Sequence, residues 1–395
     1  MATKEMAART GNEAMAEAMR QINPDVVAAY PITPATEIVQ LFSNFVADGV
    51  VDTEFVTVES EHSAMSACIG ASVAGARVMT GTSSQGLILM AEMLYIAAGM
   101  RCPIVLAEVN RALSAPLNIH CDPSDTMAVR DAGWIQFFSE NAQEAYDNMF
   151  QAIRVAEHPD VLLPAMVTTD GFIISHGMEA VEEIPDEEVK SFVGQYRPKH
   201  PLLDVDHPIT AGGLDFTDFY FEHRRQLAEA MEQARRVIPQ VADEFARKFG
   251  RQYGFIDAYR LDDAELAIVA LGSTAGTARA AVDRLRAEGV KAGLLKIRVF
   301  RPFPGEQIAQ ALGKAKAVAV MDRSDSLAGF GGPVFAEVRS ALYGTRNTPP
   351  VVDYVYGLGG RDIKIEDLVR VYRELAPLAA GQAPQKLLTY LGVRE

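Results

Sequence analysis

Cysteine is scarce in this sequence, and its scarcity narrows what the chain can do by itself. The 395 residues contain three cysteines, Cys68, Cys102 and Cys121, and no C-x-x-C pair. A disulfide framework needs several paired cysteines, and zinc or iron–sulfur sites need clustered ones. We therefore expect neither kind of site, and no metal site, within this chain.

Long apolar runs are also missing. The best candidate, Leu87–Met100, is shorter than a membrane-spanning helix and is interrupted by Glu92. The N-terminal stretch Met1–Thr10 lacks the apolar core of a signal peptide. These absences predict a cytoplasmic, soluble protein with no membrane partner.

Positive charge is in deficit, since 37 lysines and arginines stand against 52 aspartates and glutamates, a formal net charge of -15. Nucleic acids and anionic membranes repel such a chain, so we expect no nucleic-acid partner. The phosphate-binding loop G-x-x-x-x-G-K-S/T, the zinc motif H-E-x-x-H and the nucleophile motif G-x-S-x-G are absent too.

What the sequence has in plenty is alternation of strands and helices. In the N-terminal half, short apolar runs predict buried strands, and segments of helical length separate them. The predicted strands are Val26–Tyr30, Thr53–Val58, Arg77–Thr80, Pro103–Glu108 and Val161–Thr168. Such alternation indicates a parallel sheet with helices on both faces, whose ligands bind beyond the carboxyl ends of the strands.

The character of the sequence changes from about Ser175, and the length of the chain already favours two domains. Residues 191–258 are predicted to form a linker that contains a long charged helix, Phe219–Arg251. A second alternation follows, with strands at Leu266–Leu271, Ala292–Val299, Ala315–Met321 and Val351–Val355. The predicted fold class is therefore α/β, with two doubly wound parallel-sheet domains at residues 1–190 and 259–395.

The stretch V-E-S-E-H-S-A places Glu61 between the strand Thr53–Val58 and a run of small residues, Ala64–Ala76. The small, uncharged run predicts a closely packed, buried helix. A buried carboxylate without a partner costs on the order of several kcal/mol. Glu61 is thus either a structural carboxylate in the first helical turn, where the helix dipole stabilises it, or a group that carries a proton for the chemistry.

A glycine cluster in the second half, G-F-G-G-P at Gly329–Pro333, comes directly before a predicted helix. Its backbone N–H groups could cradle an anion, or the cluster could make a tight turn. A lone glycine cluster favours the turn.

Five motifs occur in one order along the chain: Y-P-I-T-P at Tyr30–Pro34, E-S-E-H-S-A at Glu59–Ala64, R-A-L-S-A-P-L-N at Arg111–Asn118, G-W-I-Q at Gly133–Gln136 and V-F-R-P-F-P at Val299–Pro304. Together they resemble the alpha subunits of pyruvate:ferredoxin oxidoreductase, among the thiamine diphosphate-dependent 2-oxoacid:ferredoxin oxidoreductases. The resemblance covers essentially the whole chain.

This resemblance implies different roles for the two domains. The first would be the pyrimidine-binding half of a thiamine diphosphate site, and the second would resemble the transketolase C-terminal domain. The diphosphate, its Mg²⁺ and the 4Fe–4S clusters would lie on partner subunits of beta, gamma and delta types. Ferredoxin would dock on such a partner, and coenzyme A (CoA) would be a co-substrate.

The same resemblance assigns roles to cofactor residues. Glu61 would be the catalytic carboxylate, hydrogen-bonded to the aminopyrimidine ring of the cofactor, and Pro31 would lie beside that ring. A carboxyl group there promotes loss of the proton from the thiazolium carbon. Glu59, two residues earlier, is expected to be a structural carboxylate.

Two further residues would contact the 2-oxoacid. The guanidinium of Arg111 suits its carboxylate, and Thr33 offers a hydroxyl on a turn that prolines restrict. Without the resemblance, Arg111 is equally well a loop arginine paired with Asp122 or Asp125.

The implied reaction is oxidative decarboxylation of pyruvate with CoA to acetyl-CoA, CO₂ and reduced ferredoxin, and it is reversible. The chain would be an enzyme subunit that is active only with its partners. Three other readings stay open: another 2-oxoacid such as 2-oxoglutarate or 2-oxoisovalerate, transketolase-like carbon–carbon transfer without electron transfer, and a non-catalytic subunit of the same fold.

Overall fold

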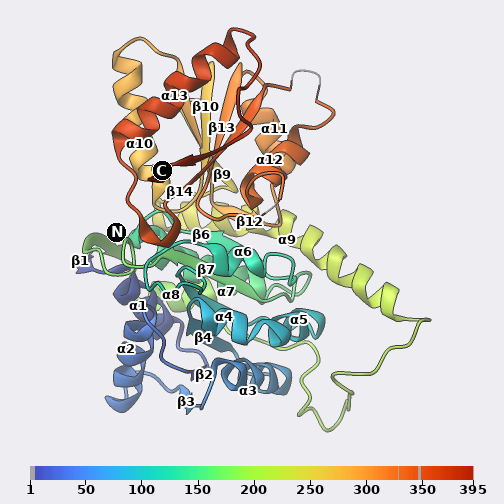
Figure 1. Cartoon of the computed structure of the whole chain (residues 1–395). Helices are drawn as coiled ribbons and strands as arrows, with labels where there is room; N and C mark the ends of the chain where they lie inside the picture. The colour runs from blue at the N-terminus through green and yellow to red at the C-terminus, as the bar shows by residue number, and fades with distance from the viewer. Residues whose placement is uncertain (1–4, 328, 346–347, 395) are drawn as a thin grey trace.

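Two α/β units make up the computed structural model, which describes residues 5–327, 329–345 and 348–394 (Figure 1). The first unit is built on a seven-stranded sheet and the second on a six-stranded sheet. The predicted fold class is confirmed. The first four residues of the stretch Met1–Thr10, and the last residue of the predicted second domain, lie outside the described residues.

The first sheet has the strand order β12-β6-β7-β5-β4-β2-β3, and its neighbours run parallel except for β12 and β6. Strands β4 to β7 are buried along their whole length, because helices cover both faces of the sheet. The strands are β2 (Val26–Ala29), β3 (Glu54–Thr57), β4 (Val78–Thr82), β5 (Val105–Asn110), β6 (Ile135–Phe138), β7 (Ala165–Asp170) and β12 (Val299–Arg301).

The first helix of the first unit, α1, begins with a capping box. The Oγ1 of Thr10 accepts the N–H of Glu13 at 3.1 Å, and the Glu13 carboxylate accepts the N–H of Thr10 at 2.7 Å. The helices are α1 (Gly11–Ile22), α2 (Thr36–Ala47), α3 (Glu61–Ala74), α4 (Gln85–Leu89), α5 (Ala91–Gly99), α6 (Ser124–Ala128), α7 (Ala142–Ala156) and α8 (Asp186–Val193).

Two of these helices have features that the local sequence does not show. Helix α2 has no side-chain cap, because Ala35 holds the N-cap position and makes no side-chain hydrogen bond. The apolar run Leu87–Met100 forms two helices, α4 and α5, which are divided at Met90.

Helix α3 departs from its prediction in burial. Ala64, Met65, Cys68 and Ile69 are buried, but Gly70 is exposed and its small neighbours are only half-buried. A methyl group added at Gly70 would meet nothing within 4 Å in the described part of the chain. The small-residue face of α3 is therefore open in this chain.

The second sheet has the order β15-β14-β13-β10-β11-β9, with β9 antiparallel to β11. Its strands are β9 (Ile256–Tyr259), β10 (Leu266–Ala270), β11 (Ala292–Ile297), β13 (Ala317–Asp322), β14 (Val351–Tyr356) and β15 (Leu388–Leu391). Its helices are α10 (Thr274–Ala287), α11 (Gly305–Leu312), α12 (Pro333–Leu342), α13 (Ile365–Ala379) and the 3₁₀ turn η1 (Leu358–Gly360). The sequence patterns miss the two edge strands, β9 and β15.

The predicted strand Ala292–Val299 breaks in two, and its end belongs to the other unit. Strand β11 stops at Ile297, while Val299 pairs with Phe137 of β6 in the first sheet. Between them, the buried guanidinium of Arg298 donates to Asn148 Oδ1 at 2.6 Å. The chain thus returns from the second unit to extend the first sheet, which ties the two units together.

Outside the two sheets, β1 (Glu5–Arg9) pairs antiparallel with β8 (Glu179–Glu183). Residues 194–219, which we call the arm, precede α9 (Tyr220–Phe249) and contain no regular element. Figure 1 shows the arm and the start of α9 extending away from the first unit. No described helix has the length and apolar character to cross a membrane.

Candidate active site

Glu61 opens helix α3 just past the carboxyl end of β3. The hydroxyl of Ser60, the N-cap residue, accepts the N–H of Ser63 at 3.3 Å and fixes the start of the helix. Glu61 is buried, with 6% of its surface exposed, whereas Glu59 is exposed. The helix dipole favours a carboxylate at this position.

The carboxyl group of Glu61 faces a piece of backbone that has no side chain. A Cβ added at Gly86, on α4, would lie 2.6 Å from Glu61 Oε1 and 2.4 Å from Thr82 Oγ1. The Thr82 hydroxyl is buried and has no hydrogen-bond partner in the described part of the chain. The first turns of α3 and α4 and the end of β4 therefore meet around Glu61 and an unused polar atom.

Arg111 and Thr33 come together at the same edge of the sheet. Arg111 Nη1 donates to the carbonyl of Thr33 at 2.9 Å, and its Nε donates to the carbonyl of Asn118 at 2.9 Å. Within the described residues, Nη2 has no hydrogen-bond partner, and no carboxylate lies within ion-pair distance of the guanidinium. Burial lowers the pKa of Arg111. Thr33 itself is exposed.

Arg111 and Asp125 are neighbours, as the alternative interpretation expects, but they do not form an ion pair through the guanidinium. The Asp125 carboxylate accepts the backbone N–H of Arg111 at 2.9 Å, and not the guanidinium. It also accepts the N–H of Ser84 at 2.9 Å and the side-chain amide of Asn110 at 2.9 Å. Asp125 therefore fixes the loop that carries Arg111 to the loop that precedes α4.

Ser84 shows how closely these two loops are joined. Its φ of 51° lies in the left-handed region that a residue with a side chain rarely adopts. The bond to Asp125 and a second bond, from Ser84 Oγ to the carbonyl of Ala112 at 2.8 Å, hold it there. Two residues after Ser84, in the first turn of α4, is Gly86, which faces Glu61.

Beneath this network lies Glu108, which the sequence analysis did not single out. It ends the apolar part of β5 and is fully buried, and neither carboxylate oxygen has a hydrogen-bond partner in the described residues. Burial, and next the charge of Asp125, hold the pKa of Glu108 well above its usual range. Burial likewise raises the pKa of Asp125 to about 6. A carboxylate at the end of an apolar strand was the available signal.

The other predicted cofactor residue, Pro31, follows the end of β2. Pro31 is exposed and lines a cavity of about 500 Å³ with Tyr30, Phe55 and Val58. No hydrogen bond joins Glu61 to Thr33 or Arg111 among the described residues. Of the predicted site residues, Arg111 and Thr33 therefore form a hydrogen-bonded pair, and Glu61 and Pro31 make no hydrogen bond to that pair among the described residues.

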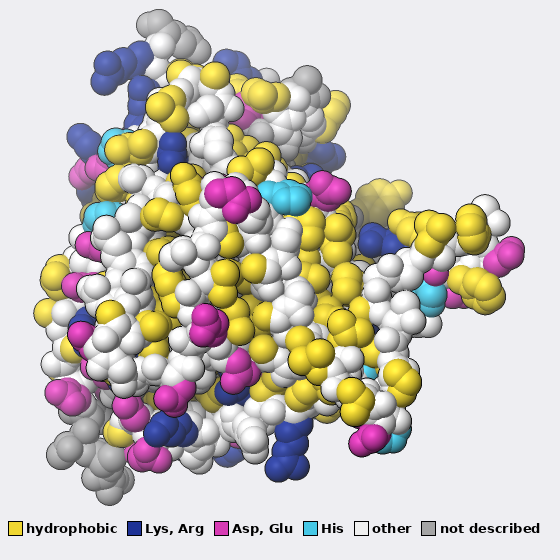
Figure 2. All heavy atoms as spheres, turned by 90° about the horizontal axis from the view of Figure 1, so that it is seen from below, with side chains coloured by type: hydrophobic (Ala, Val, Ile, Leu, Met, Phe, Trp, Pro, Cys, Tyr) yellow, Lys and Arg dark blue, Asp and Glu magenta, His cyan; other side chains and the backbone are white. Residues whose placement is uncertain are grey.

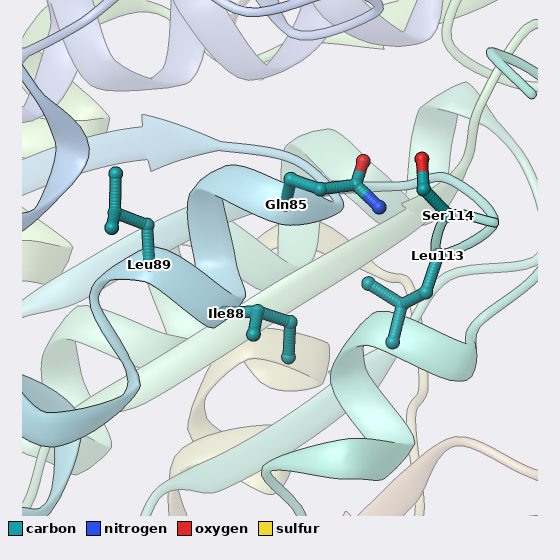
Figure 3. Close-up of a pocket in the computed structure, with 5 residues that line it drawn as sticks. All are labelled: Gln85, Ile88, Leu89, Leu113 and Ser114. Atoms are coloured by element: carbon teal, nitrogen blue, oxygen red, sulfur yellow. The ribbon is translucent and has the colours of Figure 1, made fainter. Parts of the chain in front are cut away.

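A second cavity, of about 490 Å³, lies between α4 and the loop that follows Arg111. Figure 3 shows its lining residues: Gln85, Ile88, Leu89, Leu113 and Ser114. Helix α4 thus lines this cavity with Gln85, Ile88 and Leu89 and approaches Glu61 with Gly86. Its apolar walls are open to solvent, since Leu89 is exposed.

The glycine cluster Gly329–Pro333 is a structural turn in the second unit. Both carboxylate oxygens of Asp322 accept backbone N–H groups of α12, from Val334 at 3.0 Å and Phe335 at 2.8 Å. Asp353 accepts the N–H of Gly332 at 2.7 Å. These carboxylates already occupy the donors that an anion would need.

Comparison with known proteins agrees with the motifs. Residues 17–243 match the sequence profile of the family described as "Pyruvate flavodoxin/ferredoxin oxidoreductase, thiamine diP-bdg". Residues 264–368 match the profile described as "Pyruvate:ferredoxin oxidoreductase core domain II". The chain belongs to the pyruvate:ferredoxin oxidoreductase family. The resemblance drawn from the five motifs is thereby confirmed.

Relatives in this family match over nearly their full length. The pyruvate synthase subunit PorA of Thermotoga maritima is 57% identical over 99% of both chains. PorA of Methanocaldococcus jannaschii is 51% identical over 91% of this chain and 92% of its own. The ketoisovalerate oxidoreductase subunit VorA of Pyrococcus horikoshii is 45% identical over 93% and 92%.

Solved structures share the fold of the family at low identity. A 2-oxoglutarate:ferredoxin oxidoreductase from Magnetococcus marinus matches with a TM-score of 0.71 at 20% identity, over 94% of this chain and 65% of that chain. A split-gene transketolase, an inactive beta4 tetramer, matches with a TM-score of 0.57 at 13% identity, over 94% and 100%.

The family implies thiamine diphosphate, and the residues around Glu61 fit one half of it. A buried carboxyl group, the partnerless hydroxyl of Thr82 and the bare backbone at Gly86 suit a flat, hydrogen-bonding ring. Among the described residues, no group of three or more His, Cys, Asp or Glu side chains could hold a metal ion.

Proposed function

We propose that this chain is the alpha-type subunit of a pyruvate:ferredoxin oxidoreductase. The assembled enzyme converts pyruvate, CoA and oxidised ferredoxin to acetyl-CoA, CO₂ and reduced ferredoxin, and the reaction is reversible. The observation that carries the proposal is the buried Glu61 carboxyl beside Gly86, at the edge of the sheet where Arg111 meets Thr33. The 57% identity to a pyruvate synthase subunit supports pyruvate as the substrate.

In this proposal, Glu61 binds the aminopyrimidine of thiamine diphosphate and exchanges a proton with its ring nitrogen. Bound thiamine diphosphate supplies a nucleophilic carbon for the keto group of the substrate. Glu61 suits the role because burial excludes water from its carboxyl group, and the start of α3 holds it in place. Thr82 offers an additional hydroxyl within the same space.

Arg111 and Thr33 bind the 2-oxoacid in this proposal. Backbone carbonyls accept hydrogen bonds from two guanidinium nitrogens of Arg111, Nε and Nη1. In this proposal the substrate carboxylate is therefore bound by Nη2 alone and not by the bidentate pair of hydrogen bonds that arginine usually offers. The carbonyl bonds hold the side chain rigid before substrate arrives. Thr33 is exposed and can donate its hydroxyl to the substrate.

Partner subunits of beta, gamma and delta types complete the enzyme in this proposal. They supply the diphosphate and Mg²⁺ site, the 4Fe–4S clusters and the ferredoxin docking surface. Pro31 lines a cavity together with Phe55 and Thr57 of β3, and in this proposal it lies on the cofactor side of the interface. The assembly is cytoplasmic, which is consistent with three buried free cysteines.

Exposed apolar surface supports the need for partners. Figure 2 shows hydrophobic side chains gathered over the lower face of the first unit and on the projecting arm. The most exposed of those on the arm and at the start of α9 are Val205 at 87%, Leu214 at 81%, Phe216 at 72% and Phe221 at 77%. Patches of this kind mark protein contacts in soluble proteins.

The alternatives have less support. A ketoisovalerate oxidoreductase subunit is also a relative, but at 45% identity. The transketolase likeness, at 13% identity, concerns the fold alone.

Anaerobic purification of the tagged chain from its source, with identification of every bound subunit and a panel of 2-oxoacids, tests the proposal. We expect iron–sulfur subunits and highest activity on pyruvate. A colourless assembly with carbon–carbon transfer activity, or a clear preference for 2-oxoisovalerate, would contradict it.

A further inference from the structure

The loop that carries Arg111 is clamped to the second unit at one glycine-rich turn. The side-chain amide of Asn118 donates to the carbonyl of Gly359 at 2.9 Å. In the opposite direction, the N–H of Gly359 donates to Asp122 Oδ2 at 2.8 Å. Two hydrogen bonds thus join the loop, residues 110–125, to η1, although their partners lie more than 230 positions apart in the sequence.

Only glycine fits at the two contact positions of this turn. Gly359 and Gly360 have φ values of +62° and +80°, in the left-handed region. A Cβ at Gly359 would lie 2.3 Å from Asn118 Nδ2, and one at Gly360 would lie 2.4 Å from the Cβ of His120. The loop and the turn approach as closely as backbone allows.

On its other side, the same loop holds the arginine. The carbonyl of Asn118 accepts Arg111 Nε at 2.9 Å, so one residue contacts both the turn and the guanidinium. Arg111 Nη1 then reaches the carbonyl of Thr33 at 2.9 Å. A continuous path of hydrogen bonds runs from Gly359 through Asn118 and Arg111 to Thr33.

The turn itself is anchored by a buried ion pair between the two units. Arg323 Nη1 lies 3.2 Å from Asp170 Oδ2, at the end of β7, and both side chains are 4% exposed. Arg323 Nε donates to the carbonyl of Gly357 at 3.4 Å. Asp170 also accepts the N–H of Ser273 at 2.9 Å. The position of the turn is therefore fixed relative to the first sheet.

We propose that the turn Gly357–Gly360 positions Arg111 for the substrate carboxylate, with Asn118, Asp122 and Gly359 as positioning residues. This inference rests on the proposed function, because it takes Arg111 as the substrate arginine. The second unit then acts on substrate affinity without touching the substrate. Removal of the clamp frees the guanidinium to adopt other rotamers, and binding weakens by the cost of ordering it again.

The test compares Asn118→Ala and Gly359→Ala in the assembled enzyme, with steady-state kinetics for all three substrates. Each variant should raise the KM for pyruvate by roughly three- to tenfold, the size of one lost hydrogen bond. The kcat and the KM for ferredoxin and for CoA should stay within about twofold of wild type. The double variant should be no worse than the more impaired single variant, because both remove the same contact.

Gly289→Ala is the matched control for backbone strain. Gly289 also has a positive φ, +84°, but an added Cβ there meets nothing within 4 Å among the residues that the structure describes. It should leave the KM for pyruvate unchanged. The inference is overturned if Asn118→Ala and Gly359→Ala behave like this control, or if they raise every KM equally.

Hydrogen–deuterium exchange on the full-length chain separates this inference from the proposed function. Exchange of the amides of residues 110–125 should quicken in Asn118→Ala and not in Gly289→Ala. If the wild-type assembly does not turn over pyruvate, the proposed function fails, and this exchange experiment alone decides on the clamp. Unchanged exchange in Asn118→Ala would overturn the clamp, whatever the activity.

Discussion

Both sheets of this chain are mainly parallel and covered by helices. They differ in how the polar groups near the carboxyl ends of their strands are hydrogen-bonded. At the second sheet, Asp322 binds two backbone N–H groups at the start of α12, and one oxygen of Asp353 binds the N–H of Gly332. The other oxygen of Asp353 and the hydroxyl of Ser324 have no partner among the described residues. At the first sheet, Thr82 and Glu108 are buried with atoms that have no partner among the described residues.

The comparison shows that an open parallel sheet does not make a site by itself. Carboxyl ends of strands are where ligands bind in such folds, but at the second edge three N–H donors of the turn and of α12 are already bound by Asp322 and Asp353. The first edge keeps hydrogen-bonding capacity that the described part of the chain does not use. Four predictions can break or sharpen this contrast.

The largest effect is expected from Glu61→Gln in the assembled enzyme. The amide keeps the shape of the side chain but cannot exchange a proton, so kcat should fall by roughly 10²–10⁴-fold. Thiamine diphosphate content should fall much less. Glu59→Gln, two residues earlier on the exposed side, is the control and should keep wild-type kcat. Equal loss in the two variants would remove the special role of Glu61.

Gly86→Ala should come next, because its methyl group would occupy the space of the Glu61 carboxyl and the Thr82 hydroxyl. A displacement of about 1 Å in a reacting group can lower kcat by about 10²-fold. Gly70→Ala on α3 is the control, since its added methyl meets no described residue within 4 Å. Kinetics of both variants check the prediction, and wild-type kcat in Gly86→Ala would contradict it.

A stability experiment compares the two edges directly. Asp322→Ala leaves two buried N–H donors unpaired, so the free energy of unfolding should fall by about 1–3 kcal/mol or more. Thr82→Val removes a buried hydroxyl that has no partner among the described residues, so the free energy of unfolding should stay the same or rise. Urea unfolding of the full-length chain measures both. Similar losses in the two variants would erase the contrast.

The smallest effect concerns pH and Asp125. Its pKa is raised by burial to about 6, above the ordinary value of 3.8, so the folded chain holds this proton more tightly than the unfolded chain. The contribution to stability is therefore fully present below the ordinary pKa and is lost as pH rises through about 6. The loss should be about 1–3 kcal/mol between pH 4 and pH 7.

Asp125→Asn provides the comparison for that window. The difference in unfolding free energy between wild type and variant should change with pH, in favour of wild type at the acid end. A difference that is the same at both ends of the window would argue against a raised pKa at Asp125.

Local pattern predicted much of the fold and of the candidate site. The alternation of strands and helices is a local property, and Ser60 with Glu61 carries its own signal for the start of a helix. Arg111 and Thr33 were found through motifs, and the structure brings them together at 2.9 Å.

What the sequence did not reveal depends on contacts between distant segments. The bond from Asn118 to Gly359 joins residues 241 positions apart, and Val299 leaves its own unit to pair with Phe137. No periodicity encodes such pairings. The open face of α3 was mistaken for a buried one, because small residues suit any close packing, whether within a chain or against a partner.

The central claim of this account is that the buried carboxyl of Glu61 moves a proton for the cofactor at the first sheet edge. Deuterium exchange at the thiazolium carbon of thiamine diphosphate, in assembled wild-type and Glu61→Gln enzymes loaded to the same extent, tests it most directly. We predict that exchange in the variant is slower by roughly 10²–10⁴-fold. Wild-type exchange in Glu61→Gln would contradict the claim.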